Sequence, residues 1–149
     1  MRRLGIMAPA LLVLLLPGCG DGLKRVPVYG KATAKGKPID NVFILFVPMG
    51  STKGEGGYGV TDSDGNYSLI STRTDWKGVP PGEYKVRLSR LVGPDGTALP
   101  PSTKTVDNPG ARESIPKKYL FPDTSPLRFV VPESGGEIHI EIPEGLQTR

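Results

Sequence analysis

The sequence predicts an all-β protein organised as a seven-stranded β-sandwich. Glycine and proline are frequent, with 20 and 16 among the 149 residues, so the chain must turn often. Short stretches of alternating apolar and polar residues stand between these turns, and no stretch has convincing helical periodicity. About seven such stretches follow one another, a number and spacing typical of a β-sandwich.

The N-terminus has the three parts of a secretory signal. Met1-Arg2-Arg3 is positively charged, Leu4 to Leu16 is uncharged and rich in leucine, and Pro17-Gly18-Cys19 follows. The apolar run has 13 residues, whereas a membrane-spanning helix needs roughly 20. We therefore expect residues 1–18 to be a cleaved signal peptide.

The only cysteine of the chain ends this signal. Leu16-Pro17-Gly18-Cys19 resembles the lipobox of bacterial lipoproteins, in which the cysteine is acylated and the signal is cut before it. The resemblance implies that Cys19 is a lipidation site and that a lipid anchor holds the protein at the bacterial cell envelope, on the inner or outer membrane, facing the periplasm or the exterior. Acyl chains also explain a single cysteine in an exported protein, which has no internal disulfide partner. The alternative is an incidental cysteine beside a cleavage site.

Residues 19–27 would then form the acylated cysteine and a short linker. Gly20 to Pro27 reach at most about 28 Å when fully extended, so the domain would sit close to its membrane. Lys24 and Arg25 would either lie near anionic headgroups or be solvated linker charges.

Two stretches predict the first strands. Val26 to Thr33 alternates apolar and polar residues, and Pro27 favours an edge position in the sheet. Val42 to Val47 is continuously apolar, which predicts a central strand that is buried on both faces.

Three later stretches predict strands and hairpins. Gly56 to Leu69 is typical of a β-hairpin with the turn Asp62-Ser63-Asp64-Gly65-Asn66, where Gly65 and Asn66 tolerate positive φ. After a Pro-Gly turn, Tyr84 begins an alternation that buries one face of a strand. Leu127 to Val131 and Ile138 to Ile142 predict a second hairpin through Ser134-Gly135-Gly136.

Residues 92–118 interrupt this pattern. They contain five prolines and show little periodicity, and an irregular segment of that length is usually functional or mobile. We expect this segment, together with the turn around Asp62, to be the surface that contacts a partner.

Several of these motifs together resemble a known family. They look like the carboxypeptidase regulatory-like modules, and with the lipobox they are similar to small lipoproteins abundant in planctomycete-type bacteria. The resemblance covers about residues 26–142 and implies an Ig-like or prealbumin-like (transthyretin-like) sandwich over residues 28–143, followed by a tail over residues 144–149. Such modules serve as accessory, adhesive or spacing domains. The residues that carry it are Val28-Tyr29-Gly30-Lys31, Gly36-Lys37-Pro38-Ile39, Val42 to Pro48, Thr61 to Tyr67, Val79 to Tyr84, Ile115 to Tyr119 and Thr124 to Leu127.

Two polar patterns were weighed as metal sites. Asp62, Asp64 and Asn66 place three oxygen side chains at alternate positions, as calcium ligands do, but Tyr67 and Arg73 stand where an EF-hand needs glycine and glutamate. The other interpretation is that Asp62 and Asn66 bond the turn backbone. His139, the only histidine, lies between Glu137 and Glu141 without a second imidazole. We predict no metal and no cofactor.

The aromatic side chains leave a choice between ligand contact and packing. Trp76, Tyr58 and Tyr119 lie in or beside predicted loops, where rings stack on sugars or plug the ends of a sandwich. For Trp76 and Tyr119 the plug is favoured, and Tyr67 and Tyr84 fall on inward positions.

The resulting prediction is a non-catalytic, lipid-anchored binding or structural module whose partner is an envelope protein or a glycan. The alternative is a carbohydrate-binding or calcium-assisted glycan-binding module that uses Trp76, Tyr58, Asp62 and Asp64. Apart from the signal, 17 basic and 15 acidic residues alternate without a long basic run, so nucleic acid is not expected as a partner. The Gly-x-Ser-x-Gly motif of hydrolases is absent, and the protein is not expected to be an enzyme.

Overall fold

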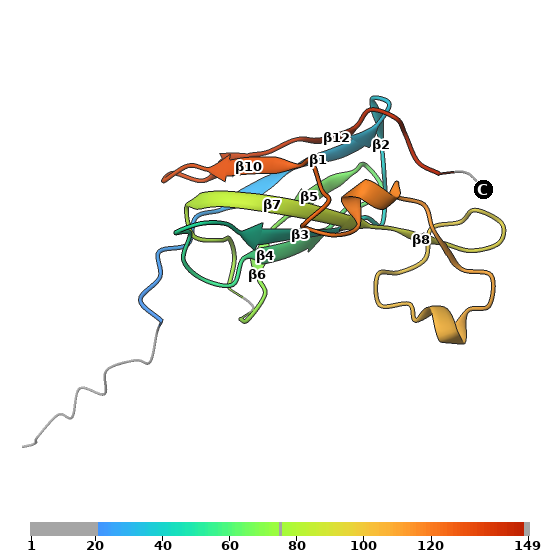
Figure 1. Cartoon of the computed structure of the whole chain (residues 1–149), viewed down its shortest axis with the longest axis horizontal. Helices are drawn as coiled ribbons and strands as arrows, with labels where there is room; N and C mark the ends of the chain where they lie inside the picture. The colour runs from blue at the N-terminus through green and yellow to red at the C-terminus, as the bar shows by residue number, and fades with distance from the viewer. Residues whose placement is uncertain (1–20, 75, 148–149) are drawn as a thin grey trace, which may run out of the picture.

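The computed structural model describes residues 21–74 and 76–147, and these form an all-β protein (Figure 1). Cys19 and the predicted signal peptide lie outside the described residues. No helix of the described part is long and apolar enough to cross a membrane. The elements are β1 (Val28–Ala34), β2 (Lys37–Pro38), β3 (Phe43–Pro48), β4 (Gly57–Val60), β5 (Asn66–Ser68), β6 (Ile70–Ser71), β7 (Gly82–Ser89), β8 (Leu91–Val92), the 3-10 helix η1 (Thr105–Asp107), β9 (Arg112–Glu113), the 3-10 helix η2 (Lys117–Tyr119), β10 (Arg128–Val131), β11 (Gly136–Glu137) and β12 (Ile140–Ile142).

The strands form two main sheets and a small ribbon. In the first sheet β1 is central, with β11 and β12 parallel to it on one side and β5 and β2 antiparallel to it on the other. The second sheet is antiparallel in the order β10-β7-β3-β4-β6. The ribbon pairs β8 with β9.

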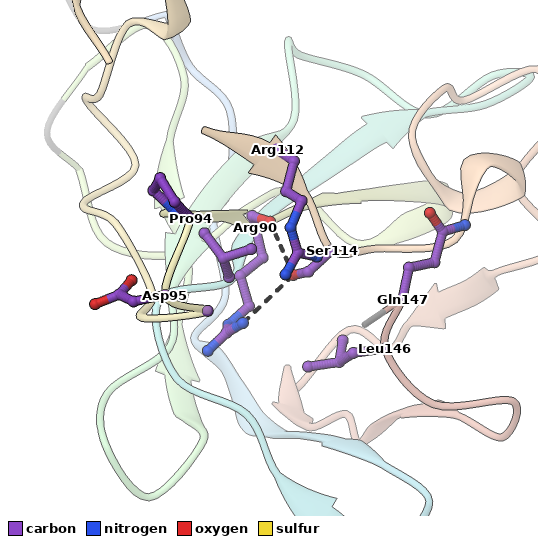
Figure 2. A pocket seen from close by; sticks show the side chains of 9 residues that line it. Arg90, Pro94, Asp95, Arg112, Ser114, Leu146 and Gln147 are labelled. Atoms are coloured by element: carbon purple, nitrogen blue, oxygen red, sulfur yellow. Dashed lines mark hydrogen bonds between the residues drawn. The ribbon is translucent and has the colours of Figure 1, made fainter. Parts of the chain in front are cut away.

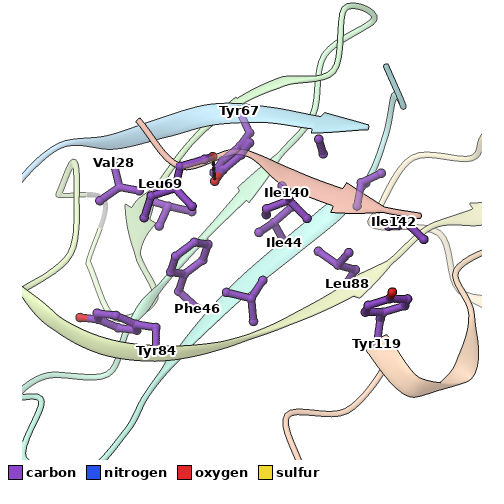
Figure 3. Close-up of a cluster of buried hydrophobic side chains, with 14 of the residues drawn as sticks. Val28, Ile44, Phe46, Tyr67, Leu69, Tyr84, Leu88, Tyr119, Ile140 and Ile142 are labelled. Carbon is purple, nitrogen blue, oxygen red and sulfur yellow. Dashed lines mark hydrogen bonds between the residues drawn. The ribbon is translucent and has the colours of Figure 1, made fainter. Parts of the chain in front are cut away.

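Apolar side chains from both sheets meet in one core (Figure 3). Ile44 and Phe46 of β3 and Ile140 of β12 are completely buried there, so the two sheets are packed face to face. Tyr67 and Tyr84 are buried, as the alternation predicts. Figure 3 shows Tyr84 and Tyr119 at opposite ends of the row of core side chains.

The strand at Val42 to Val47 is central as predicted, since β3 pairs with β4 on one side and β7 on the other. The prediction that both faces are buried is wrong. Ile44 and Phe46 face the core, whereas Phe43, Leu45 and Val47 are only half-buried on the outer face of the sheet. An apolar run alone does not reveal that one of its faces lacks a covering layer.

The prediction of an edge position for the first strand is also wrong. β1 has partners on both sides. Pro27 does not prevent this, because it precedes β1 and lacks only a donor; its carbonyl accepts a hydrogen bond from Gly136 N at 2.9 Å.

The hairpin predicted at Gly56 to Leu69 is present only in part. β4 pairs antiparallel with β6, and Asp62 N donates to the Asn66 carbonyl at 2.9 Å across the turn. Between the turn and β6, however, β5 pairs with β1, so the second arm of the hairpin begins in the first sheet and ends in the second. Thr61 fixes the first arm, because its N–H donates to the Val42 carbonyl at 3.1 Å and its hydroxyl accepts from Val42 N at 2.8 Å. The local sequence indicates the polar turn but not that its second arm is shared by two sheets.

The second predicted hairpin, through Ser134-Gly135-Gly136, is wrong. β10 pairs with β7, whereas β11 and β12 pair with β1, so Gly135 and Gly136 also connect the two sheets. Residues 92–118 are largely irregular, as predicted, but they include η1, β9 and parts of β8 and η2, so the segment is not without secondary structure.

The predicted linker is folded onto the domain over its described part. Val26 is 4% exposed and exchanges backbone hydrogen bonds with Val79 at 2.9 and 3.1 Å. Arg25 is not a solvated linker charge, since its side chain is only 10% exposed and forms an ion pair with Asp21.

A buried hydrogen bond links the strands on the two sides of β1 in the first sheet. Between β11 and β12 the carbonyl of Ile138 turns over β1, where a Cβ on Gly30 would lie only 1.8 Å from the carbonyl oxygen. The carbonyl accepts a 2.6 Å hydrogen bond from the hydroxyl of Tyr67, the direct β5 partner of Gly30. Only glycine leaves room for this crossing, and the tyrosine satisfies the buried carbonyl that results. Burial also raises the pKa of the Tyr67 hydroxyl, which therefore stays protonated as a donor.

We expect Tyr67→Phe to lower the free energy of unfolding by about 1 to 3 kcal/mol, because the Ile138 carbonyl would stay buried without a donor. Urea unfolding monitored by circular dichroism measures this. Tyr29→Phe is the matched control, since Tyr29 is 50% exposed on β1. Equal losses in the two variants would contradict the assigned role.

Candidate functional site

A cleft lies where the β8–β9 ribbon meets the C-terminal residues (Figure 2). The chain leaves β7 at Ser89, forms β8, and turns at residues 93–97, where Gly93 N donates to the Thr97 carbonyl at 2.9 Å. Asp95 closes this turn by accepting from the amide and the hydroxyl of Thr97. The cleft has a volume of about 450 Å³ and is lined by Arg90, Val92, Pro94, Asp95, Gly96, Arg112, Ser114, Leu146 and Gln147.

Arg90 holds the floor of the cleft together. Its Nε donates to the Asp40 carbonyl and its Nη2 to Asp40 Oδ1, both at 2.7 Å, while Nη1 donates to Ser114 Oγ at 3.3 Å. The side chain is only 11% exposed. Hydrogen bonds from the guanidinium lower the pKa of Asp40, so this pair stays ionised at neutral pH.

Glu113 locks the ribbon to the end of β7. Its Oε1 accepts from the backbone N–H of Arg90 at 2.8 Å and of Ile115 at 2.9 Å, and its Oε2 accepts from the Ser89 hydroxyl at 2.7 Å. These bonds place Ser114, between Glu113 and Ile115, at the wall of the cleft. The β8–β9 ribbon is therefore attached by side-chain bonds as well as by its own short ladder.

The opposite wall is the predicted C-terminal tail, of which residues 144–147 are described. Gln147 N donates to the Ser114 carbonyl at 2.7 Å. Glu144 accepts from the Tyr119 hydroxyl at 2.8 Å and forms an ion pair with Lys118. A hydrogen bond from Lys118 lowers the pKa of Glu144 to about 2, with further contributions from backbone and Tyr119 hydrogen bonds.

A second hollow of about 430 Å³ adjoins the first and shares Arg90 and Leu146 with it. Lys35 and Lys37 line this second hollow and are exposed. Among the residues that line the two hollows the cations are Lys35, Lys37, Arg90 and Arg112, and the carboxylates are Asp40 and Asp95. Both carboxylates already hold donors of the protein itself. Because Arg90 already donates to Asp40 and Ser114, it is the exposed Lys35 and Lys37 that favour a ligand with anionic groups, such as carboxylates or phosphates.

The turn at Asp62 uses its polar atoms on itself. Asp62 Oδ1 accepts from the backbone N–H of Asp64 at 2.9 Å and of Asn66 at 2.8 Å, and Oδ2 accepts from Asn66 Nδ2 at 3.3 Å. The bond from the Asn66 backbone is the largest cause of the lowered pKa of Asp62. This geometry matches the interpretation that Asp62 stabilises the turn. Asp64 is exposed on the same turn.

The aromatic candidates are separated. Tyr58 lies within β4, not in a loop, and stacks on Phe43 with ring centroids 5.7 Å apart. Trp76 lies beside Ser71, at the Gly57 end of β4, whereas Asp62 follows the Val60 end. The structure therefore does not bring Trp76, Tyr58, Asp62 and Asp64 together in one site.

The plug interpretation holds for Tyr119 and fails for Trp76. Tyr119 is 2% exposed and packs at the end of the core, so its ring is not accessible to a ligand. Trp76 is 45% exposed, and its ring packs against the Arg25 guanidinium at 4.6 Å instead of entering the core.

His139 is an exposed side chain whose Nε2 lies 3.3 Å from Glu137 Oε1. Within residues 21–74 and 76–147, no three or more His, Cys, Asp or Glu side chains gather as metal ligands do.

The sequence analysis did not single out Arg90, Arg112 or Ser114. A signal for Arg90 was present, since Arg90 continues the inward alternation of Tyr84, Val86 and Leu88. A charged residue on an inward position requires a partner at the end of the core.

Comparisons with protein-family models, with curated proteins and with solved structures gave no match.

The contribution of the C-terminal tail to the stability of the protein should depend on pH. Because the pKa of Glu144 is lower in the folded protein than its ordinary value of 4.5, its contribution to stability is complete above that value and is lost as the pH falls toward 2. We expect Glu144→Gln to lower the melting temperature at pH 6 and to have a progressively smaller effect toward pH 2. Calorimetry across this range measures the effect, with the exposed Asp123→Asn as control. A difference that does not depend on pH would contradict the assignment.

Proposed function

We propose that this chain is a lipid-anchored, non-catalytic binding module of the bacterial cell envelope. The observation that carries the proposal is the sequence Leu16-Pro17-Gly18-Cys19 at the end of a short apolar segment, with Cys19 as the only cysteine. Cleavage before Cys19 and acylation of its thiol and amino group would attach the domain to the inner or outer membrane, facing the periplasm or the exterior. Two or more acyl chains make such an attachment stable.

We also propose that the fold is a seven-stranded, transthyretin-like or Ig-like sandwich. Seven strands have three residues or more, namely β1, β3, β4, β5, β7, β10 and β12. Four of them, β1, β3, β5 and β7, overlap stretches that carry the resemblance to carboxypeptidase regulatory-like modules. The shorter strands extend this set, since β11 continues the row of β12 and β2 continues the row of β5 along β1.

The arrangement of the domain supports a binding role. The chain enters the domain at one end, and β8 lies at the opposite end (Figure 1). Val92 of β8 and Arg112 of β9 line the cleft. An anchor at Cys19 would therefore hold the cleft away from the bilayer, where an envelope protein or glycan with anionic groups could reach it. Most of the lining comes from residues 90–96 and 112–114, within or next to the segment that the sequence predicts as the contact surface.

The anchor is tested by expressing the full chain in a bacterium that processes lipoproteins, beside Cys19→Ser. We expect the wild type to begin at Cys19, to have the added mass of acyl chains and to sediment with membranes. The variant should lack the acyl mass and should not be cut before residue 19. If both proteins are unmodified and soluble, the proposed anchor is wrong.

The cleft is tested with a photo-crosslinking amino acid at Gln147 in cells that express the full chain. We expect adducts from this position and few from the same amino acid at Tyr29, which is half-exposed on the first sheet. Adducts that form equally at both positions, or only at Tyr29, would contradict a binding role of the cleft.

A further inference from the structure

The residues that precede the first strand are tied to the domain. Arg25 donates from Nη1 to Asp21 Oδ1 at 3.0 Å and from Nη2 to Asp21 Oδ2 at 2.5 Å, and Nη1 also lies 3.3 Å from the Leu23 carbonyl. Its guanidinium lies over the ring of Trp76. The hydrogen bonds from Arg25 lower the pKa of Asp21 to about 2, so both groups are charged at neutral pH. We call this arrangement of Asp21, Arg25 and Trp76 the latch.

The latch leaves little chain between the domain and the acylated cysteine. Only Gly20 stands between Cys19 and Asp21. Two residues of extended chain span at most about 7 Å, in contrast to the 28 Å that an open linker allows. Asp21 must therefore lie within about 7 Å of Cys19, and the surface around Asp21 is the part of the domain next to the anchor.

That surface has the composition of a membrane-interface region. We call it the N-terminal face and define it by Leu23, Arg73 and Trp76, which lie around Asp21 and Arg25, together with their neighbours in the sequence Lys24 and Lys77 and with Lys53, next to Gly54. Leu23 lies close to Gly54, next to Lys53, since a Cβ on Gly54 would be 3.3 Å from Leu23 Cδ1. A small hollow between Asp21, Leu23 and Arg25 on one side and Arg73 on the other joins the linker to the rest of the face.

The charges of this face suit anionic lipid. Arg25 and the four cations of the face are accompanied by Asp21, Glu55 and Glu133, which form ion pairs with Arg25, Arg73 and Lys24. The five cations outnumber these three carboxylates, and Asp75, next to Trp76 in the sequence, is outside the described residues. Lys24 and Arg73 have side chains that are 63% and 73% exposed, so they can reach headgroups. Tryptophan is enriched in membrane proteins at the depth of the lipid headgroups, because its ring is apolar and its N–H is polar.

We infer that the N-terminal face rests on the lipid headgroups, with Trp76 in the interface, and that the latch sets the orientation of the domain on the membrane. This inference rests on the proposed lipid anchor. With the latch formed, only Gly20 separates Cys19 from the domain. So short a connection does not allow the domain to rotate until its cleft faces the bilayer.

The chain is suited to a direct test, since Trp76 is its only tryptophan. The acylated full-length protein is purified, its acyl mass is verified, and it is reconstituted into vesicles of phosphatidylcholine and phosphatidylglycerol with headgroup spin labels. We expect the labels to quench most of the Trp76 emission, and the emission maximum in unlabelled vesicles to shift to shorter wavelength. The same acylated protein in vesicles without spin labels gives the baseline for quenching.

Two variants separate orientation from attachment. Arg25→Gln removes the latch and should reduce quenching while the protein remains in the vesicle fraction. Arg128→Gln, an exposed arginine on β10 away from this face, should leave quenching unchanged. If acylated wild type emits as the baseline does, the inference is overturned while the anchor stands. If the mass shows no acyl chain, the anchor is wrong and the inference falls with it.

Discussion

The crossing of the Ile138 carbonyl over Gly30, satisfied by the Tyr67 hydroxyl, is the constraint on which the first sheet depends. It brings together β5, β1 and the segment between β11 and β12, which are far apart in the sequence. Because Tyr67 spans β1 from one side to the other, the C-terminal strand is held parallel to β1 even though its ladder is interrupted. The course of β12 then decides where the tail begins. Leu146 and Gln147 reach the cleft only because Ile142 is paired with Ala34 at the end of β1.

The second constraint is electrostatic and lies at the end of the core. Arg90 follows a strand whose inward side chains are apolar, and it satisfies its charge through Asp40 and Ser114. A guanidinium that is so nearly buried requires partners with good geometry, and the loops after β2 and β9 supply them. The same interactions that compensate the buried charge give the cleft a rigid floor. The candidate site is therefore a consequence of how this end of the sandwich is closed.

The candidate site was predictable only in part. The segment 92–118 was recognisable from its length and its prolines, and it contributes much of the cleft. The arginines were not singled out, because an arginine in sequence does not reveal whether its charge is buried, and the C-terminal wall comes from residues far along the chain. Trp76 and Tyr119 show the same limit. Both lie in or beside predicted loops, yet Tyr119 packs at the end of the core while Trp76 is exposed beside Arg25.

The sequence by itself determined that the protein is all-β, where most strands lie and which side chains of a strand such as Tyr84 to Leu88 face the core. These properties follow from the alternation of side chains along an extended chain and from the φ preferences of glycine and proline, which act over a few residues. Only the tertiary structure decided which strands pair. The turns at Asp62 and at Gly135 are local and fit both a hairpin and a crossing between sheets, whereas pairing depends on distant partners such as Val42 for Thr61 and β1 for β12. The predicted hairpin at Gly135 failed for that reason, and the one at Asp62 shares its second arm with β1, because the free energy that selects a partner strand comes from the burial of both sheets together.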